Sequence, residues 1–310
     1  GLGDVYKRQV FGSSLFAQNT IDSVLAQIER NSTTLSALQK RCEANTMGNN
    51  TGNFLQNPEF EFHYLWGNPA STGNRTDINV KQSFDFPTAY SYKHQISTIK
   101  NEQVELEYQK QRQELLLQAS LICFDLIYTN ALVEELSKRQ KHAKSIVLSY
   151  KLKLAAGETN ILEVNKAQLN LLSLSKEKES LSIEKEALLG ELTRLNGGVV
   201  INFSDTVFET LVITPDFEEW YVKAEQSNPL LNWLKKEVEL SQKQVSLNKA
   251  LSLPKFQAGY MSESVIGQEF QGISVGLSVP LWENKNRVKY AKAIALATEY
   301  TASDKKLQFY

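Results

Sequence analysis

Apolar and polar residues alternate in four stretches of the chain, and these stretches form two pairs. A period of two residues is typical of a β-strand with one apolar face and one polar face. The segments between the members of each pair, GNPASTGNRT and SVIGQEFQ, are polar or contain glycine, as hairpin loops do. The sequence therefore predicts two β-hairpins, over residues 58–87 and 254–281. Their apolar positions are Phe60, Phe62, Tyr64 and Trp66, then Ile78, Val80, Phe84 and Phe86, then Phe256, Ala258 and Tyr260, and finally Ile273, Val275, Leu277, Val279 and Leu281.

A run of sixty-nine residues, 88–156, contains neither glycine nor proline. As a helix it would be about 100 Å long, at about 1.5 Å per residue. Because no compact core needs such a length, we expect this helix to pack laterally against others. The helical pattern resumes over 161–196, where leucines recur at steps of seven residues, a repeat that favours supercoiling against a neighbour. These leucines are Leu174, Leu181, Leu188 and Leu195.

The stretch LAAGETNILEV separates the two helical runs and predicts a tight turn between them. Gly157 can adopt positive φ at a helix end without steric cost, and Asn160 is a candidate N-cap for the return helix. Residues 88–196 are therefore predicted to form one long helical hairpin. Glu158 and Glu163 have two interpretations: carboxylates that line a constricted end and attract cations, or helix-start carboxylates that interact favourably with the helix dipole.

The order of the elements occurs twice. A helix, a proline and an alternating strand over 31–64 recur over 228–260, so that Pro58 and Pro254 lie 196 positions apart. Pro87 and Pro280 lie 193 positions apart, and each is predicted to close a strand and open a helix. We expect a first repeat over 19–196, a linker over 197–215 and a second repeat over 216–310. By this offset Tyr310 corresponds to a position inside the first long helix, so the second long helix is expected to be cut short.

The first 18 residues are predicted to lie outside the folded part. Residues 10–18 are similar to the end of a secretory signal, with a short apolar stretch followed by small residues and Ala17. Residues 1–9 lack the methionine and basic segment that should begin a signal, so we interpret them as an artefact of sequence assembly. The alternative interpretation is an ordinary lead-in to a helix.

Composition and charge exclude several classes of function. The 310 residues include 34 basic and 35 acidic side chains, a balance that argues against nucleic acid as a partner. No stretch approaches 18 consecutive apolar residues, so the sequence predicts no transmembrane helix. Cys42 and Cys123 form no metal-binding motif, and the histidines are scattered. Without a GxSxG, HExxH or P-loop motif, we predict neither enzyme activity nor a cofactor or metal site.

The alternating strands have two interpretations by themselves: a soluble sheet over a core, or membrane strands with one face to lipid and one to water. The long helices favour the second, because a sheet of membrane length joined to a helix of about 100 Å suits a molecule that spans the envelope. A periplasmic adaptor and a soluble coiled-coil scaffold are the alternatives. An adaptor would have one hairpin between glycine-rich half-motifs, and a scaffold leaves the four strands unexplained.

Several features together resemble the TolC-like outer-membrane factors, the exit ducts of tripartite efflux pumps and of type I secretion. The resemblance extends from about Asn19 to the end of the chain. It rests on Tyr150, Gly157, the LEV of 162–164 and the Ala-Gln of 167–168 near the turn, on Asn228 and Pro229 at a helix start, and on the strand–proline junctions at Pro87 and Pro280.

The resemblance implies an α+β membrane protein that forms a homotrimer. Each protomer would give four strands to a 12-stranded β-barrel in outer-membrane lipid and long helical hairpins to a periplasmic α-barrel, with 197–211 in an equatorial belt. The partners implied are a periplasmic adaptor, or membrane fusion protein, and an inner-membrane transporter of the RND type. The turn residues Gly157, Glu158, Thr159 and Asn160 would dock the adaptor. The lipid-facing residues would be Phe60, Phe62, Tyr64, Trp66, Ile78, Val80, Phe84, Ile273, Val275, Leu277 and Val279.

Two strand segments resemble the heavy-metal branch of this family, the cobalt–zinc–cadmium and copper–silver efflux proteins. They are NPEFEFHYLW and INVKQSFDFPTAY. The resemblance implies that the exported solutes are heavy-metal cations, with drugs or other solutes as the alternative. The scatter of His63, His94 and His142 does not weigh against metal export, because a duct need not bind its cargo.

Overall fold

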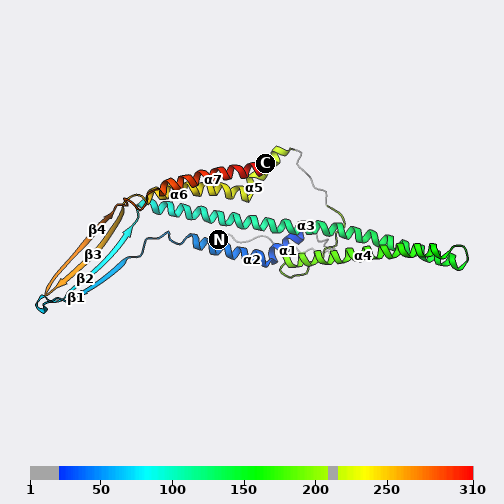
Figure 1. Cartoon of the computed structure of the whole chain (residues 1–310), viewed down its shortest axis with the longest axis horizontal. Helices are drawn as coiled ribbons and strands as arrows, with labels where there is room; N and C mark the ends of the chain where they lie inside the picture. Colours follow the sequence, from blue (N-terminus) through cyan, green and yellow to red (C-terminus); the bar gives the residue numbers. More distant parts are fainter. Residues whose placement is uncertain (1–20, 209–215, 310) are drawn as a thin grey trace, which may run out of the picture. The chain divides into compact units, whose positions relative to one another are not determined.

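The computed structural model describes residues 21–208 and 216–309, and in them the order helix, helix, hairpin, helix occurs twice (Figure 1). The proposed signal remnant and the end of the predicted linker lie outside the described residues. The first series is α1 (Ile21–Asn31), α2 (Thr33–Asn49), β1 (Glu59–Leu65), β2 (Arg75–Phe84) and α3 (Pro87–Ala155), followed by α4 (Ile161–Leu195). The second series is α5 (Phe217–Ser227), α6 (Pro229–Ala250), β3 (Lys255–Val265), β4 (Gln268–Ser278) and α7 (Arg287–Phe309).

Two compact units make up the chain, and only one of them, the sheet unit, draws on both predicted repeats. The hairpin unit consists of Gly1–Ala37 and Arg112–Ile213, and the sheet unit of Leu38–Gln111 and Thr214–Tyr310. The four strands belong to the sheet unit, and the turn between α3 and α4 belongs to the hairpin unit.

One antiparallel sheet contains all four strands, in the order β1-β2-β3-β4. The pairing of β2 with β3 joins the two predicted hairpins, so that Phe60, Val80, Tyr260 and Ile273 form one row across the sheet. Because side chains alternate along each strand, every residue in such a row lies on the same face. The register therefore places the predicted apolar positions of all four strands on one face of the sheet.

The two hairpin loops differ in length. Between β1 and β2 the chain makes a long loop that includes the short 3-10 helix η1 (Ala70–Thr72), as the polar segment predicted. Between β3 and β4 only Ile266 and Gly267 form the turn, with φ of 32° and 70°. The prediction that SVIGQEFQ is a loop was wrong for most of its length. Two positive φ values give a turn that matches the twist of the flanking strands, so the strands continue up to it.

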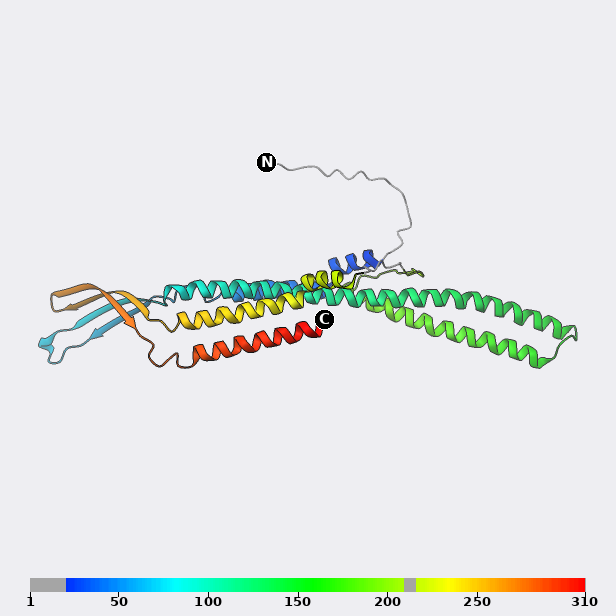
Figure 2. The same cartoon turned by 90° about the horizontal axis from the view of Figure 1, so that it is seen from above.

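The helical hairpin occurs where the absence of breakers predicted it. Helix α3 has 69 residues and α4 has 35, and they run side by side in opposite directions in both views (Figures 1 and 2). Pro87 occupies the first position of α3, where a missing N–H costs nothing. Leu195 is buried and the other three leucines of the heptad are half-buried. The amide of Gln140 on α3 donates to the Ser175 hydroxyl on α4 over 2.9 Å.

The second strand-to-helix junction differs from the first, and this corrects the prediction that each proline opens a helix. Pro87 begins α3, but Pro280 lies in a segment without regular structure that extends over 279–286. The Asn284 amide donates to the carbonyl of Leu251 over 2.9 Å, and Asn286 takes a φ of 64°. The chain therefore turns in a separate segment before α7 begins.

Two equivalent ion pairs support the duplication. In the hairpin unit Arg112 on α3 pairs with Glu29 on α1. In the sheet unit Lys306 on α7 pairs with Glu225 on α5 over 2.7 Å. The members of these pairs correspond at offsets of 196 and 194 residues, close to the offsets of the prolines.

Helix α3 is also apolar enough in its middle part to meet the length and composition test for a membrane span, the one such helix among the described residues. The sequence analysis predicted none, because polar residues interrupt every apolar run and only consecutive residues were counted. Of the apolar 18-residue window, 39% is buried within the chain, and the core helix of a soluble protein meets the same test. Cys123, Leu126 and Ile127 in this region are buried, which fits a helix that packs against its neighbours.

Candidate functional site

The sheet has an apolar face that remains uncovered in the chain. Ile273 is 85% exposed and Val275 is 82% exposed, although both are large aliphatic side chains in a regular strand. Soluble monomers rarely expose so large a contiguous apolar patch. All but two of the predicted lipid-facing residues lie in the strands on this face; Trp66 follows β1 and Val279 follows β4. The large apolar side chains of this face are Phe60, Phe62, Tyr64, Ile78, Val80, Phe84, Phe256, Tyr260, Ile273, Val275 and Leu277, and the register also places Gln82, Ser262 and Gln271 on it.

The opposite face carries most of the charged side chains of the sheet, and several of them form ion pairs. Arg75 on β2 lies 2.8 Å from Asp77 on the same strand and 3.0 Å from Glu263 on β3. Lys81 lies 3.0 Å from Glu61 on β1. The sequence analysis did not identify these partners, because the pairs between strands depend on the register. The polar face carries Glu59, Glu61, His63, Arg75, Asp77, Asn79, Lys81, Ser83, Lys255, Gln257 and Glu263.

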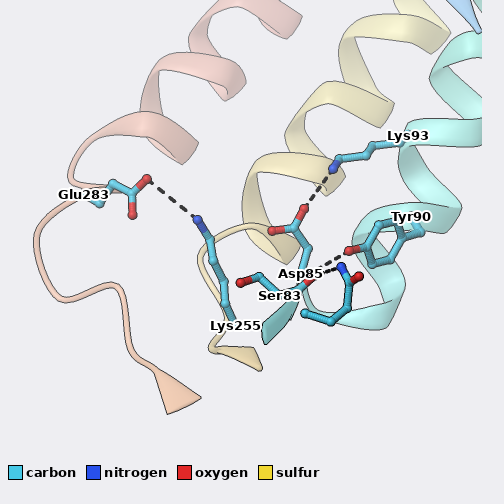
Figure 3. Close-up of polar contacts among 7 residues, drawn as sticks. Ser83, Asp85, Tyr90, Lys93, Lys255 and Glu283 are labelled. Carbon is cyan, nitrogen blue, oxygen red and sulfur yellow. Dashed lines mark hydrogen bonds and ion pairs between the residues drawn. The ribbon is translucent and has the colours of Figure 1, made fainter. Parts of the chain in front are cut away.

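A polar cluster fixes the junction between β2 and α3 (Figure 3). Asp85 is only 8% exposed, and Lys93 donates to its carboxylate over 2.8 Å. The backbone N–H of Asp85 donates to the Tyr90 hydroxyl over 2.9 Å, and the Lys93 ammonium lies 5.1 Å from the centre of the Tyr90 ring. The second junction has a weaker contact, between Lys255 and Glu283 at 4.0 Å. The sequence analysis missed this cluster. An acidic residue just before Pro87, followed by a lysine two turns into the helix, is the pattern that could have predicted it.

The predicted turn residues lie together in one exposed loop at the end of the helical hairpin. Gly157 has a φ of 74°, and the N–H of Glu158 donates to the carbonyl of Lys153 over 2.9 Å, a glycine-ended helix terminus. Asn160 caps α4 as predicted, because its side chain accepts from the N–H of Glu163 over 3.1 Å. Glu163 pairs with Lys166 over 2.9 Å, which favours the helix-start interpretation of this carboxylate.

No cluster in the described ranges 21–208 and 216–309 has three or more histidine, cysteine or acidic side chains that could hold a metal ion. Cys123 is buried, and burial raises the pKa of its thiol to about 11. Partial burial and the nearby Glu105 carboxylate also raise the pKa of the Cys42 thiol. Both thiols are free and favour the protonated form at neutral pH.

No protein-family model matches the chain, and no curated protein matches it. Solved structures do match. The CmeC outer membrane channel of Campylobacter jejuni superposes with a TM-score of 0.72 at 15% identity, over 99% of this chain and 73% of that one. CusC superposes with a TM-score of 0.72 at 12% identity, over 99% of this chain and 80% of CusC. The outer membrane protein VceC of Vibrio cholerae superposes with a TM-score of 0.71 at 12% identity, over 93% of this chain and 75% of VceC. The chain therefore has the fold of TolC-like outer-membrane channels.

Proposed function

We propose that this protein is an outer-membrane factor, the passive exit duct of a tripartite efflux pump. The observation that carries the proposal is the sheet with one uncovered apolar face and one ion-paired polar face, in a chain that also builds the hairpin of α3 and α4. Such a sheet fits a wall between lipid and water. The fold shared with outer-membrane channels supports the same conclusion.

The apolar face, together with Trp66 and Val279, would contact outer-membrane lipid. Strands β2, β3 and β4 have 10, 11 and 11 residues, and a tilted transmembrane strand needs about 9–11. Each large side chain that moves from water into lipid would contribute about 1.5–3 kcal/mol. The helices would then extend into the periplasm.

The sheet supports a homotrimer as the functional form. Strands β1 and β4 lie at the two edges of the sheet, with one unpaired side each. Unpaired backbone groups cannot face the hydrocarbon region, and about eight strands form the smallest membrane barrel. Three copies of this four-stranded sheet would close a barrel of twelve strands.

The turn Gly157, Glu158, Thr159 and Asn160 would dock a periplasmic adaptor that connects the duct to an inner-membrane transporter of the RND type. The turn suits contact with another protein because it is exposed and because neighbouring apolar side chains, Leu152, Ile161 and Leu162, are also exposed.

We also propose that the chain consists of repeats over 19–196 and 216–310 joined by a linker over 197–215. The recurrence of elements and of the α1–α3 and α5–α7 ion pairs supports this division.

Fractionation of the cell envelope tests the duct. Expressed with a secretory signal, the protein should be recovered from the outer membrane as a trimer in mild detergent. Recovery in the soluble periplasm, without any trimer, would contradict the proposal.

We propose heavy-metal cations as the cargo, on the strength of the two strand segments that resemble the heavy-metal branch. Deletion of the gene should lower tolerance to zinc, cobalt or copper and leave drug tolerance unchanged. Unchanged metal tolerance with lowered drug tolerance would contradict this cargo and leave the duct proposal intact.

A further inference from the structure

On the polar face of the sheet, Arg75 forms ion pairs with two carboxylates, more than any other cation on that face of the described strands. It begins β2, at the end of the strand remote from α3. Its Nε lies 2.8 Å from Asp77 Oδ1, and its Nη2 lies 3.0 Å from Glu263 Oε2. Lys81, nearer to the helices, meets the single carboxylate Glu61. One guanidinium therefore balances two carboxylates that come from neighbouring strands.

These three side chains form a group whose charge depends on Arg75. With the guanidinium present the group carries one net negative charge, and without it the group would carry two. The side chains of Arg75, Asp77 and Glu263 are 44%, 22% and 31% exposed, so the group lies at the surface and reaches solvent. Its field would therefore act on ions that pass along this face.

We propose that Arg75 determines the charge selectivity of the outer part of the pore by offsetting half of the negative charge of Asp77 and Glu263. This inference rests on the proposed function, because it requires the polar face to line a water-filled pore. Three copies would place three such groups around the lumen. Conduction requires that an ion binds well enough to enter and weakly enough to leave. A ring of carboxylates without Arg75 would bind multivalent cations more strongly and slow their exit, and Arg75 weakens this binding.

Reversal potentials in planar bilayers test the inference, with purified trimer in a gradient of potassium chloride. Arg75→Gln should raise the permeability of potassium relative to chloride by about threefold or more, because the local cation concentration follows the potential of the wall. Arg75→Lys keeps the positive charge and should retain the wild-type ratio of potassium to chloride permeability. Arg139→Gln is the matched control: it removes a guanidinium that pairs with Glu135 on the exposed surface of α3 and is no part of the sheet, and it should leave the ratio unchanged.

A second variant keeps the test informative if Arg75→Gln does not assemble. Asp77→Asn combined with Glu263→Gln leaves Arg75 uncompensated and should shift the ratio toward chloride. Wild-type ratios in both variants would overturn the inference and leave the duct proposal intact. A wild-type trimer that conducts no ions would overturn the proposed function and this inference with it.

Discussion

Gly157 takes a φ of 74° at the end of α3 and donates its backbone N–H to the carbonyl of Leu154 over 3.1 Å. Proline fixes φ near −65° and has no N–H, so Gly157→Pro should reshape the turn without affecting the sheet. We expect efflux to be lost, measured as tolerance to an exported compound. The amount of trimer in the outer membrane should stay unchanged.

Gly190 provides the control for this variant. It lies inside α4, and a Cβ built there meets nothing within 4 Å. Gly190→Ala should therefore stabilise the helix by up to about 1 kcal/mol and retain efflux. If Gly157→Pro also retains efflux, the turn has no role in adaptor docking.

Lys93 compensates the buried carboxylate of Asp85 at the junction of β2 and α3. Lys93→Met should lower stability by about 3 kcal/mol, because it leaves a buried charge without its partner. The midpoint of thermal unfolding in detergent would report the loss. Adding Asp85→Asn should recover most of it.

The exposed pair of Lys138 and Glu134 supplies the comparison for the junction. Its loss in Lys138→Met should change stability by less than about 1 kcal/mol. Equal losses of stability in Lys93→Met and Lys138→Met would show that the burial of Asp85 adds nothing to the strength of its ion pair.

Residue-level predictions from the sequence were accurate where the determinant is local. Gly157 and Asn160 act through neighbours three to five positions away, and both were identified. Arg75 and Glu263 are 188 positions apart in the sequence, and only the pairing of β2 with β3 brings them together. Partners of that kind cannot be read from spacing along one chain.

At the scale of whole elements, the predictions were again accurate where the determinant is local and wrong where it is distant in the sequence. The bounds of α3 and α4 were predicted to within one residue, because glycine and proline mark their ends. The start of α7 was misplaced by several residues, because the contact of Asn284 with Leu251 delays the helix. The turn at Ile266 lies inside the predicted loop, but the loop was predicted too long, since a β-branched residue rarely takes positive φ and gave no sign of a two-residue turn.

Glu225 on α5 and Lys306 on α7 link two elements through an ion pair whose effect depends on pH. The hydrogen bond from Lys306 lowers the pKa of the Glu225 carboxyl below its ordinary 4.5, and the bond to Glu225 raises the pKa of Lys306 above its ordinary 10.5. The stabilisation should therefore be present between these two pH values. It should be lost as pH falls below 4.5, through the lowered pKa of Glu225, and as pH rises above 10.5, through the raised pKa of Lys306.

Thermal unfolding of the wild type and of Glu225→Gln across this range would check the prediction. The wild type should unfold at the higher temperature near neutral pH, and the difference should vanish in acid. A difference that persists below the pKa of Glu225 would mean that the carboxylate does not stabilise through its charge.

For the whole molecule, the two faces of the sheet should respond differently to an added charge. Val275 lies on the apolar face, where arginine should cost about 2–4 kcal/mol in each copy at the level of the membrane midplane. Val275→Arg should therefore reduce the amount of heat-resistant trimer in the outer membrane.

Gln257 on β3 offers a control from the same region of the sheet, since it lies opposite Gly276, the residue after Val275. It lies on the polar face, and Gln257→Arg should assemble normally. Loss of trimer in both variants, or in neither, would contradict the assignment of the faces to lipid and water.

The two strand-to-helix junctions differ in mechanical stiffness. Between β2 and α3 there are two residues, held by a buried ion pair, whereas eight residues separate β4 from α7. Torque applied along α3 would pass directly into β2, and the same torque along α7 would be absorbed by the intervening segment. Of the two joints by which a strand leads into a helix, one is thus short and held by an ion pair and the other is long, so we expect α7 to adjust its direction without deforming β4.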